Sequence, residues 1–231
     1  MKKILVIIPA RGGSKGLKDK NIKLLDNKPL ISWTIEAAKG SKYVDKVIVS
    51  TDSIKIAEIA KEYGAEVPFI RPDELSGDKA SSIDVILHAM NYMNENLEYN
   101  ADYIMLLQCT SPLRTTVHID EAVEKFITSD AESLVSTTEL EHPIFWCKKI
   151  NDDGYLESFI KYDDTKQYRR QEFETLYRLN GAIYISKWQY VLNNKRLISD
   201  YTVPYIMDKK SSIDIDNMDD FNLASYYIKN I

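Results

Sequence analysis

The sequence "ILVIIPARGGSKGLKDKN", residues 4–21, decides the fold class of this chain. Its apolar start, residues 4–9, predicts a strand that is buried on both faces of a sheet. This apolar run ends after about seven residues in arginine and glycine without a cleavage site, so we interpret it as a strand and not as a signal peptide. Three glycines and four cationic side chains follow directly. They indicate an anion-binding loop at the end of the first strand.

Two standard phosphate-binding motifs do not fit this loop. A P-loop needs Ser or Thr after its Gly-Lys pair, but Gly16 follows Lys15. The dinucleotide fingerprint needs glycine two positions before Gly13, where the chain has Arg11. The loop therefore predicts a triphosphate site that uses side chains as well as backbone N–H groups. The alternative is a solvated turn with ordinary lysines.

Length and charge limit the class of protein. The chain has 231 residues, and we predict a single domain over residues 1–231. Its formal net charge of −5 argues against nucleic acid as a partner. Cys109 and Cys147 have neither disulfide nor metal-site spacing, which favours reduced thiols in the cytoplasm. No apolar stretch approaches the roughly 20 residues that cross a bilayer, so no membrane association is expected.

Strand and helix patterns alternate along most of the chain. The expected strands lie at 4–9, 46–51, 65–70, 102–107, 133–137, 182–186 and 212–216. The expected helices lie at 29–40, 53–64, 81–97, 116–127 and 218–230. This order predicts an α/β fold with a mostly parallel sheet flanked by helices, and ligands at the carboxyl ends of the strands. Residues from about 139 to 178, which are rich in aromatic and charged side chains, predict an excursion from the sheet.

The segment "SIDID", residues 212–216, suggests a metal site. If it forms a strand, Asp214 and Asp216 share one face and lie about 7 Å apart. Two carboxylates in this arrangement suit a hard cation such as Mg²⁺. The alternative is a polar edge strand in which Asp216 or Asn217 caps the last helix.

Six motifs, in order along nearly the whole chain, resemble those of the acylneuraminate cytidylyltransferases, or CMP-sialic acid synthetases. They are "IPARGGSKGLKDKN", "VSTDS", "RPDELSGDKASS", "LLQCTSPLR", "RLNGAIYI" and "SIDIDNMDDF". The chain differs at Cys109, where the family usually has proline, which leaves that loop backbone less constrained. The resemblance implies a Rossmann-like nucleotide-diphospho-sugar transferase fold and a homodimer joined through the excursion at about 139–178.

The resemblance also implies a reaction. CTP and N-acylneuraminate would give CMP-N-acylneuraminate and diphosphate, through in-line attack of the anomeric hydroxyl on the α-phosphorus. Legionaminate or pseudaminate as acceptor stays open. A sugar-phosphate nucleotidyltransferase and a catalytically silent nucleotide-binding domain are further alternatives.

The motifs place the roles implied by the resemblance on numbered residues. The expected catalytic residues are Lys20, Arg11 and Asp214. The expected CTP-binding residues are Arg11, Ser14, Lys15, Asn21, Arg71, Ala80 and Ser82. The expected sugar contacts are Gln108, Thr110, Arg170, Gln171 and Asn180. The expected Mg²⁺ ligands are Asp214 and Asp216.

Two of these assignments have physical arguments beside the resemblance. The planar guanidinium of Arg170 can bind the sugar carboxylate with two hydrogen bonds, in its own subunit or in its neighbour. The alternative is that this arginine pairs with nearby carboxylates on a solvated face. Near the cytosine, either Ser81 or Ser82 is equally well explained as the cap of the helix at 81–97.

Overall fold

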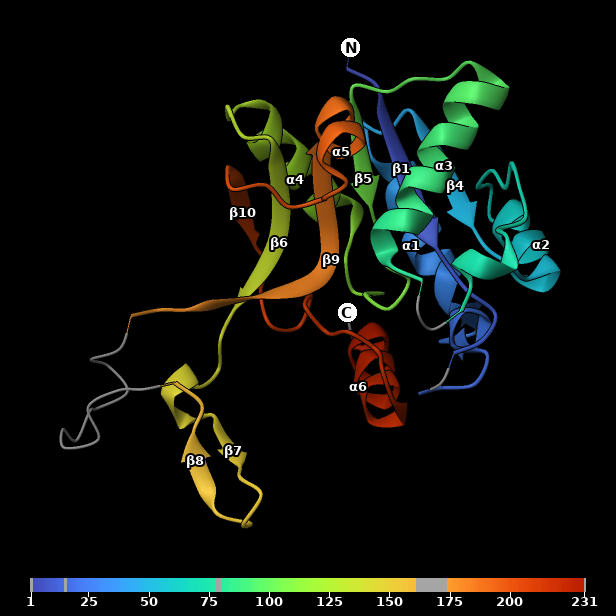
Figure 1. Ribbon diagram of the computed structural model, residues 1–231. Helices are drawn as coiled ribbons and strands as arrows, with labels where there is room; N and C mark the ends of the chain where they lie inside the picture. Colours follow the sequence, from blue (N-terminus) through green and yellow to red (C-terminus); the bar gives the residue numbers. More distant parts are fainter. Residues whose placement is uncertain (1, 15, 78–79, 161–173, 231) are drawn as a thin grey trace.

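The chain folds around a six-stranded, mostly parallel sheet with helices on both faces, as the alternating pattern predicted (Figure 1). The computed structural model describes residues 2–14, 16–77, 80–160 and 174–230. The strand order is β10-β6-β9-β5-β1-β4. Only β9 runs antiparallel to its neighbours. The strands are β1 (Ile4–Pro9), β4 (Lys46–Ser50), β5 (Tyr103–Leu106), β6 (Ser133–Glu139), β9 (Tyr177–Lys187) and β10 (Thr202–Ile206).

The helices form two layers against the sheet. They are α1 (Leu30–Gly40), α2 (Ile54–Glu62), α3 (Ser82–Leu97), α4 (Thr116–Ile127), α5 (Trp188–Asn194) and α6 (Met218–Lys229). Buried side chains of α1, α2 and α4 pack on one face, and those of α3 and α5 pack on the other. The α6 helix packs in a separate small cluster near the carboxyl ends of the strands, together with the short hairpin of β2 (Leu24–Leu25) and β3 (Lys28–Pro29).

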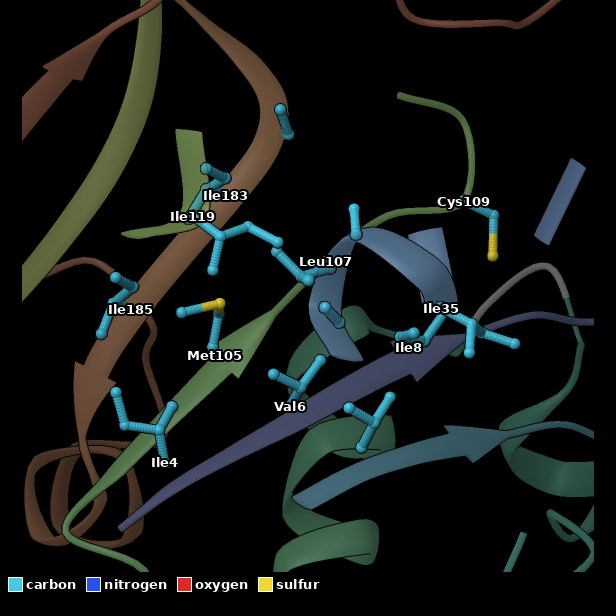
Figure 2. Packing of buried hydrophobic residues seen from close by; sticks show 14 of the residues in the cluster. Ile4, Val6, Ile8, Ile35, Met105, Leu107, Cys109, Ile119, Ile183 and Ile185 are labelled. Atoms are coloured by element: carbon cyan, nitrogen blue, oxygen red, sulfur yellow. The ribbon is translucent and has the colours of Figure 1, made fainter. Parts of the chain in front are cut away.

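Alternating side chains of β1 show why this strand lies inside the sheet. Ile4, Val6 and Ile8 point into the layer with α1 and α4 (Figure 2). Leu5 and Ile7 point into the opposite layer with α3 and α5. All five are at most 1% exposed. Burial of such a side chain contributes about 1.5–3 kcal/mol, so the first apolar run alone anchors both layers.

Two expected strands were wrong. Within 65–70, only Glu66 pairs with the sheet, through an isolated parallel bridge to Ile48. Pro68 follows two residues later and has no N–H group to extend the ladder. The segment 212–216 is a loop, because its apolar side chains pack with α6 instead of joining the sheet. Conversely, β10 was not expected; it contains Pro204, which an edge strand tolerates.

The described segment after β6 leaves the main sheet (Figure 1). It holds the 3₁₀ turn η3 (Ile144–Trp146) and a two-stranded hairpin of β7 (Lys148–Ile150) and β8 (Leu156–Ser158). We call residues 144–159 the projecting hairpin. Within the described chain, no helix is long and apolar enough to cross a membrane.

Candidate functional site

Three adjoining cavities lie at the carboxyl ends of β1 and β5. The central cavity, of about 340 Å³, is lined by Pro9, Arg11, Asn21, Arg71, Leu75, Gly77, Ala80, Ser82, Val85, Leu106, Gln108, Cys109 and Thr110. The loop cavity, of about 400 Å³, is lined by Pro9, Arg11, Ser14, Gly16, Lys20, Asn21, Thr110 and Asp216. The side cavity, of about 380 Å³, is lined by Ser82, Ile83, Leu106, Gln108, Tyr184, Lys195, Arg196, Leu197 and Ile198. The central cavity shares wall residues with each of the other two.

The glycine loop, which is the predicted anion-binding loop after β1, is held by close contacts to other parts of the chain. A Cβ atom at Gly16 would overlap the carbonyl oxygen of Asp216, so glycine allows the first loop to touch the segment before α6. The backbone N–H of Gly12 donates to Asp52 Oδ1 at 2.9 Å. The buried amide of Asn21 donates to the carbonyl oxygen of Arg11 at 3.0 Å. These contacts fix Gly12, Gly16 and Asn21 of the predicted anion-binding loop relative to Asp52 and Asp216.

Arg71 is buried in the wall of the central cavity. Its Nε donates to Ser76 Oγ at 3.2 Å, and its Nη2 lies 3.6 Å from Asp52 Oδ1. Burial lowers the pKa of Arg71, and the carboxylate of Asp52 partly offsets this effect. Asp52 thus connects Arg71 with Gly12 in the glycine loop. We did not predict a role for Asp52, although its position at the end of the second strand could have suggested one.

Lys20 connects the first loop with the segment before α6. Its Nζ donates to the carbonyl oxygen of Ile215 at 2.6 Å and to Asp216 Oδ1 at 3.2 Å. The Lys20 side chain is 13% exposed, whereas that of Asp216 is 77% exposed. The ammonium group is therefore held at the wall of the loop cavity, with a carboxylate beside it on the solvent side.

The two predicted metal ligands are arranged differently from the expected strand pair. Asp216 lines the loop cavity, whereas Asp214 lines a cavity of about 640 Å³ against α6. Burial raises the pKa of Asp214, and the charge of Asp216 raises it further, while Thr110 and Lys20 oppose the rise. The two carboxylates are therefore close enough to interact, but they do not share a strand face.

The side chains around Asp214 and Asp216 determine whether Mg²⁺ could bind there. No group of three or more His, Cys, Asp or Glu side chains among the described residues could hold a metal ion. However, the buried Oδ1 atom of Asp214 has no hydrogen-bond partner within the described chain. An unpartnered carboxylate oxygen beside a second carboxylate fits Mg²⁺, which usually takes one or two protein carboxylates and completes its shell with water and phosphate oxygens.

The expected sugar residues divide into two groups. Gln108 lines both the central and the side cavity, and Thr110 Oγ1 donates to Gln108 Oε1 at 3.3 Å. Asn180 is only 2% exposed, and its amide bonds within the protein to Ser136 and Ser212. The structure thus gives Asn180 partners that involve no ligand. Arg170 and Gln171 lie outside the described residues, and so does Lys15 of the glycine loop.

At the start of α3, one residue caps the helix and its two neighbours line the central cavity. Ser81 is the N-cap residue, and its hydroxyl accepts the backbone N–H of Asp84 at 3.2 Å. Ser82 and Ala80 line the central cavity. The sequence could not decide which serine caps the helix, because serine is a favourable cap at either position; the structure assigns the cap to Ser81.

The side cavity was not expected from the sequence. Its outer wall is the segment 195–198, which follows α5, and this wall combines Lys195 and Arg196 with apolar residues. No motif in the sequence indicated this segment. It could have been found only by placing the segment after α5 next to the end of β5, which requires the strand order.

Comparison with known proteins agrees with this arrangement. The cytidylyltransferase family matches residues 5–229, so the chain belongs to the cytidylyltransferases. The chain is 44% identical to N-acylneuraminate cytidylyltransferase of Escherichia coli over 96% of its length, which covers 51% of that protein. It therefore spans about half the length of this relative.

Other relatives match over nearly their whole length. CMP-N,N'-diacetyllegionaminic acid synthase of Legionella pneumophila is 37% identical, with 96% of this chain and 94% of that protein covered. Pseudaminic acid cytidylyltransferase of Campylobacter jejuni is 35% identical, with 98% and 97% covered. Among solved structures, CMP:2-keto-3-deoxy-manno-octonic acid synthetase has a TM-score of 0.73 at 17% identity, with 99% of both chains covered. That likeness confirms the predicted fold class.

Proposed function

We propose that the chain transfers CMP from CTP to the anomeric hydroxyl of a nine-carbon α-keto acid sugar of the sialic acid type, with release of diphosphate. The observation that carries this proposal is the continuity of the three cavities. Arg11, Asn21 and Thr110 line both the central and the loop cavity, whereas Gln108 and Ser82 line both the central and the side cavity. A nucleoside in the central cavity would have its phosphates on one side and an acceptor on the other.

The polar lining of the central cavity suits a cytidine. Cytosine presents a carbonyl acceptor and an amino donor, so its pocket needs groups of both kinds. The Arg71 side chain and the start of α3 at Ala80 and Ser82 supply donors and acceptors in one wall. A volume of about 340 Å³ lies within the usual range of small-molecule sites. The base therefore belongs against α3, with the phosphates toward the glycine loop.

The loop cavity suits a triphosphate undergoing transfer. Arg11 and Lys20 line it, and Ser14 lies at the same wall. Because attack on the α-phosphorus increases charge on the leaving diphosphate, fixed cations stabilise the transition state. Lys20 meets this need because Ile215 and Asp216 hold its ammonium group in place. We assign Arg11 to charge neutralisation and Lys20 to the reacting phosphate.

We propose Mg²⁺ as the cofactor, with Asp214 and Asp216 as its protein ligands. When bound, the ion would neutralise phosphate charge and orient the transferred group. The protein contributes the buried, unpartnered oxygen of Asp214 and the exposed carboxylate of Asp216. Lys20 lies beside Asp216 and keeps that carboxylate oriented toward the loop cavity.

We place the acceptor in the side cavity, next to Gln108 and Thr110. This cavity is lined by apolar groups and by the cations Lys195 and Arg196 at its outer wall. Arg170 and Gln171 remain proposed sugar contacts from outside the described residues. N-acylneuraminate is the first candidate acceptor. Legionaminate and pseudaminate are the second, because relatives with those names match this chain over nearly their entire length.

A diphosphate-release assay tests the proposed reaction. CTP, UTP and ATP would be offered in turn with Mg²⁺ and with N-acetylneuraminate, a legionaminate or a pseudaminate. We expect release only with CTP, and with one acceptor at least tenfold faster than with the others. CTP binding without diphosphate release for every acceptor would contradict the proposal and favour a silent nucleotide-binding domain.

We also propose a homodimer that forms through the projecting hairpin. Trp146, Ile150, Tyr155, Leu156 and Phe159 are all more than half exposed there. Apolar surface concentrated in one segment usually marks an interface between proteins. A second copy of this chain would cover it.

A further inference from the structure

Arg114 is a fully buried cation that the proposed reaction does not yet use. It lies just before α4, is 1% exposed, and heads the largest fully buried side chains of the described chain. Its Nη1 donates to the carbonyl oxygen of Gln108 at 3.1 Å and to that of Ala182 at 3.0 Å. No carboxylate among the described residues pairs with it, and its Nε and Nη2 atoms have no hydrogen-bond partner there.

Burying such a charge is unfavourable. An ion without a counter-ion loses its hydration, and an apolar side chain of similar volume is often as stable or more stable in its place. Burial lowers the pKa of Arg114 to about 10, which shows that the folded protein disfavours the charged form. A residue that opposes folding in this way needs another explanation, and its two acceptors supply one.

The two carbonyl oxygens that accept from Arg114 lie just beyond the point where the backbone pairing of β5 and β9 ends. The β5–β9 ladder pairs Met105 with Ile185 and ends with the pair of Leu106 and Tyr184. Gln108 and Ala182 would form the pair two steps further along. Instead, the Arg114 guanidinium lies between their carbonyl oxygens. It therefore joins the loop after β5 to β9 where backbone pairing has stopped.

Besides the bond from Arg114, Gln108 makes contacts to two other parts of the chain. Its carbonyl oxygen also accepts the hydroxyl of Thr34 from α1 at 3.3 Å. Its side-chain amide lies over Gly181, where an added Cβ atom would be 3.6 Å from Oε1, and Gly181 has a positive φ of 77°. Because Gln108 lines both the central and the side cavity, its position sets the boundary between the proposed nucleotide and acceptor sites.

We infer that Arg114 is a positioning residue of the transfer reaction, which holds Gln108 against β9 so that the Gln108 amide can orient the acceptor next to the nucleotide. The inference rests on the proposed function. A charged donor suits this task because hydrogen bonds from charged groups are stronger than neutral ones. Arg114 touches neither cavity, so it acts only through Gln108.

The test combines Arg114→Met with Gln108→Ala in a double-mutant cycle. Arg114→Met should unfold at the same denaturant concentration as the wild type or a higher one, because it removes an unpaired buried charge. Its kcat/KM for the acceptor should fall about 10- to 100-fold, since small displacements near the reacting groups carry such costs. CTP binding, measured by calorimetry, should change much less.

The coupling between the two residues is the critical readout. In the Gln108→Ala background, Arg114→Met should lower kcat/KM little further, because the residue through which it acts is gone. Additive losses would overturn the inference, and so would an equal loss of CTP and acceptor binding. Arg114→Lys, which keeps the charge, should recover part of the activity. Lys42→Met, which removes an exposed cation paired with Glu124, is the matched control.

Two further measurements keep the inference testable if Arg114→Met does not fold or the wild type shows no turnover. Thr34→Val removes the other donor to the Gln108 carbonyl and should give a smaller effect in the same direction. Hydrogen exchange of residues 107–114 should be faster in Arg114→Met or Arg114→Lys than in the wild type. Unchanged exchange would overturn the inference that Arg114 holds Gln108 against β9. An inactive wild type with faster exchange in the variants would overturn only the proposed function.

Discussion

The glycine loop and the projecting hairpin differ in how far their side chains are held by contacts within one chain. The glycine loop is polar, yet hydrogen bonds tie it to Asp52 after β4 and to Ile215 before α6, and the bond from Asn21 to Arg11 closes it on itself. The hairpin is rich in apolar residues, yet Ile150 and Leu156 are 72% and 75% exposed. An isolated two-stranded hairpin is marginally stable in water. The described part of the loop is therefore held by contacts within one chain, whereas the hairpin exposes apolar surface that the proposed homodimer would cover.

This difference indicates where a substitution should act. In the glycine loop and its partners, each side chain has a specific geometry, so a change should alter the chemistry and leave the fold intact. In the hairpin, Ile150 and Leu156 are largely exposed, so a change there should alter the proposed assembly more than the fold. The predictions below test this division, beginning with the largest expected effect.

Asp214→Ala should lower kcat by at least about 100-fold, a typical cost of removing one fixed charge from a transition state. Removal of Mg²⁺ with a chelator should abolish activity to a similar extent. Because burial raises the pKa of Asp214, its ionised form opposes folding at pH 7, so the variant should unfold at an equal or higher denaturant concentration. Diphosphate release and urea unfolding measure the two effects. Full activity after chelation would eliminate the metal role of Asp214.

Lys20→Ala should lower kcat by about 10²- to 10³-fold and change CTP affinity less, because its charge is assigned to the transition state. The fixed position of the ammonium group near Ile215 is the physical reason. Lys18→Ala is a matched control, since Lys18 is exposed on the same loop and lines none of the three cavities. Steady-state kinetics at varied CTP separate the effects. Normal turnover with only a raised KM for CTP would refute the assignment.

Substitution of both Ile150 and Leu156 by Asp should convert a dimer to a monomer. Each loss of a central apolar contact costs on the order of 1–2 kcal/mol in an interface. The unfolding of the main sheet should change little, because both side chains are exposed within one chain. Sedimentation at micromolar concentration measures the change, with Tyr201→Asp as an exposed control outside the hairpin. A wild-type monomer at this concentration would contradict the proposed homodimer.

Asp102→Asn should have the smallest effect. The backbone N–H of Lys3 and the Lys2 side chain lower the pKa of Asp102. A lowered folded-state pKa stabilises the protein above the unfolded value of about 4, and this gain is lost as the pH falls through the folded value. The variant should lose at most about 1 kcal/mol at pH 7, since Asp102 is partly solvated. Urea titrations at pH 7, 5 and 3 should show the full difference at pH 7 and a smaller one at pH 3, because the gain starts to fall below about pH 4.

Local patterns predicted the elements that form the sheet core. The strand at 4–9 agrees with the structure, and the helix expected at 116–127 has the same bounds as α4. These segments carry their own signal in apolar periodicity and caps. The pattern gave the wrong state for 212–216, because Ile215 packs with α6 and its N–H binds the carbonyl of Thr110. Such long-range contacts leave no mark on periodicity.

The residues of the candidate site were harder to predict from local sequence patterns. The residue pattern pointed only to a loop with four cations, and the family resemblance selected Arg11 and Lys20 among them and added Arg71, Ser82 and Gln108. None of these signals could show that Arg114 bridges Gln108 and Ala182, because the bridge depends on where the β5–β9 ladder ends. Likewise, the glycine at position 16 is explained only by the carbonyl of Asp216 beside it.

The bond from Lys20 to the carbonyl of Ile215 joins residues separated by 195 positions. During synthesis, the glycine loop leaves the ribosome early but must wait for residues 215–216 before its lysine is fixed. Contacts of such long sequence separation slow folding, because the intervening chain must first be ordered. The ammonium group of Lys20 therefore takes its place in the proposed phosphate site only late in folding, when the segment that holds Ile215 and Asp216 has docked.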